Sequence, residues 1–418
     1  MNPTIPRGGR EQYRRFTKAH PDINLVAQAQ VAAAGQTMES MQKLMTAIAA
    51  GVPPDVTIID RFVVGGWAAR GALRPLDDLI GRDRFLWSDF YEPCRDEATY
   101  KGHIYAIPTG TDNRGLYWNK RLFREAGLDP DRPPRDWAEI VSYAKRLNRT
   151  DQNGAIITLG FSPIYGQNAL YLYGWQNGGE FMSPDGERCT MNDPNIVAAL
   201  DWLVNLCDAL GGAEQIGAFG SSFQGEDQHP FLNGRIAMIV DGNWILGVIA
   251  RYRPDLDFGV APVPMPDERQ PPISWAGGWA WAIPRGTRNV EGAWTTIKWL
   301  IGPQGHKANA AGEHAFNQRL HSPYVVGMTG NGRIDRELAS IYNPLLQNDH
   351  LAQSMEMFLG LMPVSRFRPV TPVGAELWNE QARAVNNAIY HKMTPQQALD
   401  TATANVQRAL DEFFRWHP

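Results

Sequence analysis

Charged and aromatic residues follow two apolar segments of the chain, at the points where strands would end. Asp60 and Arg61 come directly after the apolar run 56–59, and Trp244 lies in the polar turn after the run 234–240. Carboxylates bind hydroxyl groups, and indole rings pack against the mildly apolar faces of sugar rings. Ligands of open α/β sheets lie outside the carboxyl ends of strands. The positions of Asp60 and Arg61 therefore indicate a ligand site, with a surface ion pair as the alternative for both.

Carboxylates could also catalyse the hydrolysis of a glycoside. Asp60 and Asp112 would suit a glycoside hydrolase if their carboxyl groups lay about 5 to 9.5 Å apart, but any acidic pair could be given those roles. The sequence has no G-x-S-x-G elbow, no phosphate-binding loop and no H-E-x-x-H motif. Its nine histidines are scattered. The sequence therefore shows none of these catalytic motifs, and we expect neither a metal nor a cofactor.

The length and composition of the chain indicate how many lobes it has and which classes of protein are excluded. A chain of 418 residues exceeds what one core usually covers, so two lobes are expected. The net charge of −4, without a block of lysine and arginine, argues against nucleic-acid binding. No segment approaches eighteen consecutive apolar residues, so we expect no transmembrane segment. The first twenty residues lack an apolar core, so the chain as given has no signal peptide.

The three cysteines leave two arrangements open. They are not spaced as metal ligands. A disulfide between Cys189 and Cys207 would suit an oxidising compartment and would leave Cys94 unpaired. The sequence favours three reduced, buried thiols.

The elements that would position the candidate residues alternate between helices and strands. Asp136 and Glu139 have the spacing of a capping box and begin an amphipathic helix that ends near residue 147. A second helix is expected over 290–301. Short apolar strands are expected over 56–59, 116–118, 234–240 and 275–284. This alternation is typical of an α/β fold.

Three groups of residues occur in one order along the chain. The first runs from YKGHIYAIP at 100–108, through the polar loop 109–115, to LYW at 116–118. The second is NGRIAM at 233–238, and the third is GGWAWAIP at 277–284. In this order they resemble the carbohydrate-type solute-binding proteins of ABC importers, the maltose-binding-protein-like group called extracellular solute-binding protein family 1.

The resemblance implies a fold and an activity. The fold is α/β and of the two-lobed periplasmic-binding-protein type (type II-like), with a hinge and a ligand cleft between the lobes. Lobe 1 would hold residues 1–108 and 270–312, and lobe 2 would hold residues 113–260 and 318–418. The protein would be a monomeric receptor that binds a mono- or oligosaccharide and delivers it to the permease subunits. A carbohydrate-active enzyme, and the same fold with a non-sugar solute, stay as alternatives.

The resemblance also implies roles for individual residues. Asp112 lies in the loop 109–115, where similar proteins carry a sugar-binding acid, and Asn113 shares this loop. Trp244 and Trp378 match two aromatic residues that stack on the sugar. The alternatives are a turn-forming role for Asp112 and core positions for both tryptophans. The remaining candidate substrate-binding residues are Asp60, Arg61, Tyr165, Gln167, Asn168, Trp275, Gly277, Gly278, Trp279 and Arg366. Ordinary strand packing is the alternative for the residues of 275–279, and a solvated surface position is the favoured interpretation of Arg366.

The beginning of the chain departs from the family pattern. Similar proteins have an apolar strand before the helix that here starts near Glu11, and this sequence lacks both that first strand and an export signal. A misplaced start codon or a trimmed chain would explain both losses. We expect a periplasmic or extracellular location, and lipid anchoring stays open.

Overall fold

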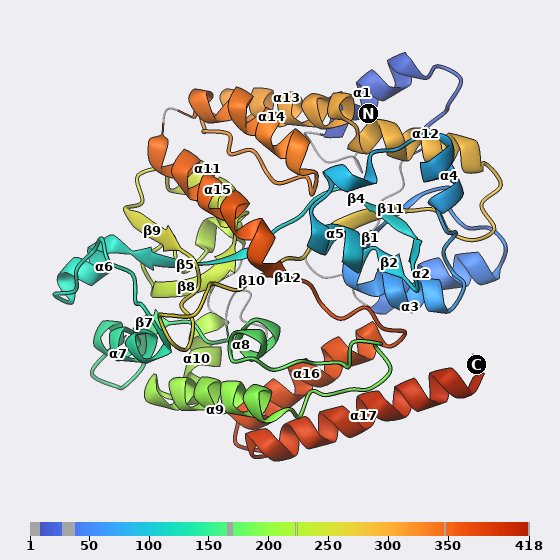
Figure 1. Ribbon diagram of the computed structural model, residues 1–418. Coiled ribbons are helices and arrows are strands. Elements are labelled where there is room, and N and C mark those ends of the chain that lie inside the picture. Colours follow the sequence, from blue (N-terminus) through green and yellow to red (C-terminus); the bar gives the residue numbers. More distant parts are fainter. Residues whose placement is uncertain are drawn as a thin grey trace. The chain divides into compact units, whose positions relative to one another are not determined.

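The computed structural model describes residues 9–26, 38–164, 170–221, 223, 225–346 and 348–416 (Figure 1). The chain forms two compact units, and each is built from three stretches of sequence. The stretches of unit 1 are Met1–Asp112, Gly277–Ala352 and Val370–Gly374, and those of unit 2 are Asn113–Ala276, Gln353–Pro369 and Ala375–Pro418. The sequence assigned residues 318–418 to lobe 2, whereas the chain as far as Ala352 packs with unit 1. The boundaries of the functional lobes stay a prediction.

Unit 1 contains a three-stranded sheet in the order β1-β11-β4. These strands span Thr57–Asp60, Trp279–Ala282 and Ala106–Pro108, respectively. Both outer strands pair antiparallel with β11. The outer strands are therefore parallel to each other, and their carboxyl ends lie at the edge of the sheet where β11 begins.

Helices cover both faces of this sheet. Ala106 and Ile107 are fully buried but belong to different apolar clusters, because successive residues of a strand point to opposite faces. The cluster around Ala106 includes side chains of α2 (Met38–Ala49) and α3 (Val64–Ala69), and the cluster around Ile107 includes side chains of α4 (Asp77–Arg82) and α12 (Val290–Ile301). The other elements of unit 1 are α1 (Gly9–Ala19), η1 (Arg61–Val63), η2 (Trp87–Asp89), α5 (Glu92–Glu97), β2 (Thr99–Tyr100), β3 (His103–Ile104), α13 (Pro303–Arg319), α14 (Gly332–Tyr342) and η4 (Asn343–Leu345).

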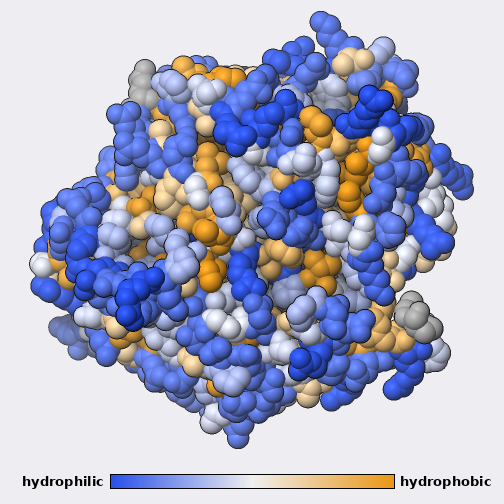
Figure 2. Space-filling model, viewed as in Figure 1, coloured by the Kyte–Doolittle hydropathy of each residue, from blue (hydrophilic) through white to orange (hydrophobic). Residues whose placement is uncertain are grey.

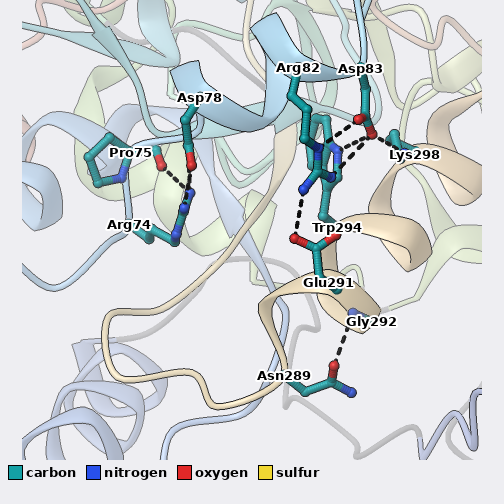
Figure 3. A network of polar contacts seen from close by, with 10 residues as sticks. All are labelled: Arg74, Pro75, Asp78, Arg82, Asp83, Asn289, Glu291, Gly292, Trp294 and Lys298. Carbon is teal, nitrogen blue, oxygen red and sulfur yellow. Dashed lines mark hydrogen bonds and ion pairs between the residues drawn. The ribbon is translucent and has the colours of Figure 1, made fainter.

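A network of polar contacts joins α4 to α12 within unit 1 (Figure 3). Asp83 accepts hydrogen bonds from Arg82 Nε at 2.8 Å and from Nε1 of the buried Trp294 at 2.9 Å, and it also pairs with Lys298. Arg82 Nη1 donates to Glu291 at 2.7 Å. The hydrogen bonds from Arg82 and Lys298 hold the pKa of Asp83 well below its usual range.

Unit 2 contains a five-stranded mixed sheet in the order β6-β7-β8-β5-β9. These strands span Arg149–Thr150, Ile156–Phe161, Ile236–Gly242, Arg114–Asn119 and Phe258–Ala261, respectively. Every residue of the central strand β8 is buried. It runs parallel to β7 and antiparallel to β5, so that Arg114 at the start of β5 pairs with Gly242 at the end of β8. A short parallel pair joins β10 (Ser274–Trp275) to β12 (Ser365–Arg366).

Helices complete unit 2. The side chain of Asp136 accepts a hydrogen bond from Glu139 N at 2.7 Å and caps α7 (Trp137–Leu147), as the capping box predicts. The other helices are α6 (Lys120–Glu125), α8 (Leu170–Gln176), α9 (Pro194–Ala209), α10 (Gly212–Gly220), η3 (Glu226–Gln228), α11 (Ile245–Tyr252), η5 (Met362–Val364), α16 (Gly374–Ile389) and α17 (Pro395–Trp416). One more helix, α15 (Asp349–Leu361), includes residues of both units, and the first residue of α16, Gly374, belongs to unit 1.

The structure tests the expectations for the cysteines and for membrane-spanning segments. Cys94, Cys189 and Cys207 are free and buried, as the sequence favoured, and the alternative disulfide is not formed. Among the described residues, no single helix is long and apolar enough to cross a membrane, and only α9 and α10 taken together, bent by 75°, meet that criterion. The face of the molecule seen in Figure 2 is mostly hydrophilic, with apolar residues gathered in small patches.

Candidate functional site

In unit 1, several predicted residues gather at the edge of the sheet where β1 and β4 end and β11 begins. Asp60 is the last residue of β1 and pairs with Trp279, the first residue of β11. Thr109 N, just after β4, donates to Trp279 O at 3.0 Å. Asp112 forms a bridge with Gly277, and its Oδ1 accepts a hydrogen bond from Gly277 N at 3.0 Å. This edge therefore carries two half-buried carboxylates beside a half-buried indole.

Arg61 lies beneath this edge, in the interior of unit 1. Its side chain and that of Glu97 are both 0 % exposed. Its Nε donates to Glu97 Oε2 at 3.1 Å, and its Nη1 donates to Gly110 O at 2.6 Å. Its Nη2 donates to Thr111 Oγ1 at 3.3 Å and to Gly277 O. All three nitrogens thus have acceptors inside the unit, although the sequence had placed Arg61 among the ligand-binding residues.

The glycine at position 278 is required by this packing. Gly278 has φ +128°, a backbone conformation that side-chain-bearing residues rarely adopt. A Cβ atom here would lie 2.4 Å from Gly110 O and 2.9 Å from Arg61 Nη1. The conformation also explains why β11 begins only at Trp279, although the sequence predicted a strand from residue 275.

In unit 2, two tryptophans and an arginine form a platform at the carboxyl end of β8. The Arg114 guanidinium lies 4.8 Å from the ring centroid of Trp244 and 4.3 Å from that of Trp275. Such cation–π contacts hold all three side chains in place. The Trp244 ring also packs directly over Gly242, where an added Cβ would lie 2.0 Å from it. Trp244 is 39 % exposed, whereas Trp275 is 1 % exposed.

Further aromatic and basic side chains extend this platform. Trp378 is half-buried. Its ring centroid lies 6.0 Å from that of Trp275 and 6.0 Å from that of Tyr171, on which it stacks. The Arg368 guanidinium lies 5.8 Å from the centroids of both tryptophans. At the surface, Arg366 Nη2 forms an ion pair with Glu180 Oε2 at 2.7 Å, and the Arg366 guanidinium lies over the ring of Trp175. The candidates Trp244, Trp275 and Trp378 therefore belong to one aromatic cluster of unit 2.

Asn113 is buried in unit 2 and anchors the start of β5. Its Nδ2 donates to Phe358 O at 2.8 Å and to Ser365 Oγ at 3.3 Å. Among the described residues, Asn113 Oδ1, Asn243 Oδ1 and Trp275 Nε1 are buried without a hydrogen-bond partner. Buried polar groups of this kind are normally satisfied by a partner, so they mark this region as suited to a polar ligand.

Some predicted residues lie outside this description, and other residues were missed. Tyr165, Gln167 and Asn168 lie outside the described residues. Thr111 and Glu97 were not predicted, and no local sequence signal marks them, because their contacts join distant segments. In the described parts of the chain, no three histidine, cysteine or acidic side chains are grouped so that they could hold a metal ion.

Comparisons with known proteins place the chain in a family. A model of the bacterial extracellular solute-binding protein family matches residues 3–307. The mannitol-binding protein of Pseudomonas aeruginosa is 28% identical over 295 residues, 68% of this chain and 63% of that protein. The diacetylchitobiose binding protein DasA of Streptomyces coelicolor is 28% identical over 292 residues, 67% of this chain and 64% of that protein.

Solved structures agree with the sequence relatives. The structure of CpMnBP1 with mannobiose bound matches with a TM-score of 0.77 and 28% identity, and the match covers 96% of each chain. The predicted α/β fold of the periplasmic-binding-protein type and the predicted family are therefore confirmed. The chain belongs to the bacterial extracellular solute-binding protein family.

Proposed function

We propose that the protein is the substrate-binding receptor of an ABC importer and that it binds a mono- or oligosaccharide. The observation that carries this proposal is the indole of Trp244, which is 39 % exposed and is fixed by Arg114 at the end of the central strand of unit 2. A fixed ring that remains open to solvent can stack on the apolar face of a sugar with little loss of side-chain entropy. Relatives named for mannitol and diacetylchitobiose, and one solved with mannobiose, support a polyhydroxy ligand.

The polar groups of the two units fit the same ligand class. Asp60 and Asp112 in unit 1 supply carboxylate oxygens, which accept hydrogen bonds from sugar hydroxyls. Asn113 and Asn243 in unit 2 supply buried amide oxygens. Hydrogen bonds to a charged group contribute about 1.5–3 kcal/mol each, and a hydroxyl-rich ligand offers many donors.

We further propose that the receptor changes between an open and a closed form, as the family resemblance implies. A closed form with more ligand contacts would be favoured by binding, because a ligand shifts the population toward the state that it binds more tightly. The permease would then recognise the closed form. This role places the protein in the periplasm or at the cell surface, as a monomer.

The competing function is hydrolysis of a glycoside by the acidic pair Asp60 and Asp112. Asp112 Oδ1 is engaged by Gly277 N, and Asp60 accepts a hydrogen bond from Phe62 N at 3.2 Å. Both carboxylates thus already stabilise the local backbone. We therefore favour binding without bond cleavage.

Calorimetric titration with mannobiose, diacetylchitobiose, maltotriose and mannitol tests the proposal. We expect saturable binding of at least one sugar, with the sugar recovered intact. Trp244→Ala should weaken that binding by about 1–3 kcal/mol, the loss seen when an aromatic residue that stacks on a nucleic-acid base is replaced by alanine. Trp416→Ala is the matched control, since Trp416 is 72 % exposed on α17.

Three outcomes would contradict parts of the proposal. Release of monosaccharides from a glycoside would favour the hydrolase. Binding of a polyamine, phosphate ester or peptide in place of every sugar would keep the fold and change the ligand. An unchanged affinity of Trp244→Ala would show that this indole does not contact the sugar.

A further inference from the structure

We infer that Arg61 is a positioning residue, which holds the sugar-facing edge of unit 1 in shape and does not contact the sugar. This inference rests on the proposed function, because it assigns a role within the same site. The position of Arg61 directly after β1 makes it look like a ligand contact in the sequence. The structure instead directs its guanidinium inward, toward Glu97.

The burial of Arg61 leaves it little capacity for a ligand. Its side chain is 0 % exposed, and each of its nitrogens already donates to an acceptor of unit 1. A buried arginine is stable only when its charge is paired and its donors are satisfied. Glu97 supplies the charge, and backbone carbonyls supply most of the remaining acceptors. Turning the guanidinium toward a ligand would break this arrangement.

The acceptors of Arg61 belong to the segments that carry the candidate ligand residues. Gly110 and Thr111 directly precede Asp112, and Gly277 directly precedes the φ +128° glycine that leads into β11. The backbone N of Arg61 also donates to Gly278 O at 3.0 Å. One residue at the end of β1 therefore ties together the loop after β4 and the segment before β11. The planar guanidinium suits this role, because its donors diverge at fixed angles that an ammonium group lacks.

Thr111 links the Arg61 side chain to the segment that carries Asp112. Its Oγ1 accepts from Arg61 Nη2 and donates to Gly277 O at 3.0 Å, and its backbone N donates to Met328 O at 3.0 Å. The adjacent Asp112 is held by both N–H and carboxylate contacts with Gly277. The position of the Asp112 carboxylate therefore depends on a hydrogen-bond network centred on Arg61.

Hydrogen exchange measured by mass spectrometry tests this role without any ligand. In Arg61→Lys, backbone amides of 109–112 and 277–279 should exchange faster by on the order of tenfold, the effect of losing one charge-assisted hydrogen bond. The control is Arg70→Lys, because Arg70 Nη1 donates to Gly66 O at 3.0 Å and Pro372 O at 2.5 Å, away from this edge. Its effect should be confined to peptides around 66 and 372.

Affinity provides the second readout, measured for a sugar that the wild-type protein binds. Arg61→Lys should weaken binding about tenfold at a temperature where it is fully folded, whereas Arg70→Lys should bind as the wild type does. Thr111→Val keeps Arg61 and removes only the hydroxyl link, so it tests the network if Arg61→Lys does not fold. It should show the same local increase in exchange.

The two proposals fail in different ways. If the wild type binds no sugar of the panel, the proposed function fails while the exchange experiment still tests Arg61. Unchanged exchange at 109–112 and 277–279 in Arg61→Lys, or in Thr111→Val where the lysine variant does not fold, would overturn the positioning role. An affinity loss in Arg61→Lys with unchanged exchange would instead make Arg61 a direct sugar contact.

Discussion

Asp335 gives a pH-dependent stability that can be predicted in sign and size. Its side chain lies in α14 and is 3 % exposed. Its Oδ1 accepts hydrogen bonds from Thr329 N at 2.6 Å and from Thr329 Oγ1 at 2.7 Å. Burial raises the pKa of this carboxyl group from 3.8 to about 6, and the hydrogen bonds from Thr329 only partly oppose that shift.

The sign follows from proton binding in the two states. Between pH 3.8 and about 6, the folded protein keeps the Asp335 proton that the unfolded chain has lost. Folding is therefore favoured at acid pH, and this contribution is lost as the pH rises through the folded-state pKa. A shift of about two units corresponds to about 3 kcal/mol at 1.36 kcal/mol per unit.

Asp335→Asn removes the charge and keeps an acceptor for Thr329. Urea unfolding should therefore show the variant gaining stability over the wild type as the pH rises, by about 2 kcal/mol between pH 4.5 and 7.5, the part of the total that falls in this window. Asp22→Asn, at an exposed position, controls for the change in net charge. A stability difference that stays flat, or that shrinks as the pH rises, would refute the reasoning.

The remaining predictions concern His306 and Gly278. Burial lowers the pKa of His306 from 6.5 to about 4, so wild-type stability should fall as the pH drops through this window. In urea unfolding at acid pH, His306→Gln should lose about 3 kcal/mol less unfolding free energy than the wild type does. The same dependence of stability on acid pH in the variant and the wild type would contradict this. Gly278→Ala should cost at least about 2 kcal/mol because of its φ and its contact with Gly110 O, whereas Gly81→Ala, which meets no atom within 4 Å, should be neutral or stabilising. Equal thermal stability of the two alanine variants would rule out the strain argument.

Elements with strong local signals were predictable from the sequence. The helix expected over 290–301 is α12 (Val290–Ile301), and Asp136 caps α7 as its spacing with Glu139 indicates. The apolar run 56–59 becomes β1 with a shift of one residue. These features depend on capping side chains and on apolar periodicity within a few residues, so a single sequence contains the necessary information.

The site residues depended on contacts that a single sequence does not display. Arg61 lies 216 positions from Gly277, whose carbonyl it binds, and Arg114 lies 160 positions from Ser274, whose hydroxyl binds its backbone. Burial of a charged side chain follows from such distant partners and not from its neighbours. Sequence reasoning therefore pointed to the end of β1 as a candidate ligand region and could not anticipate the inward orientation of Arg61.

The order of strands in unit 1 has a consequence for how the newly made chain folds. Its middle strand, β11, is synthesised only after the whole stretch Asn113–Ala276 of unit 2, although both neighbours of β11 precede residue 112. A nascent chain that has just completed β4 would expose two parallel strands with no partner between them. The sheet of unit 1 therefore cannot form completely until the stretch of unit 2 before β11 has been synthesised. A fragment that stops at residue 276 should remain prone to aggregation.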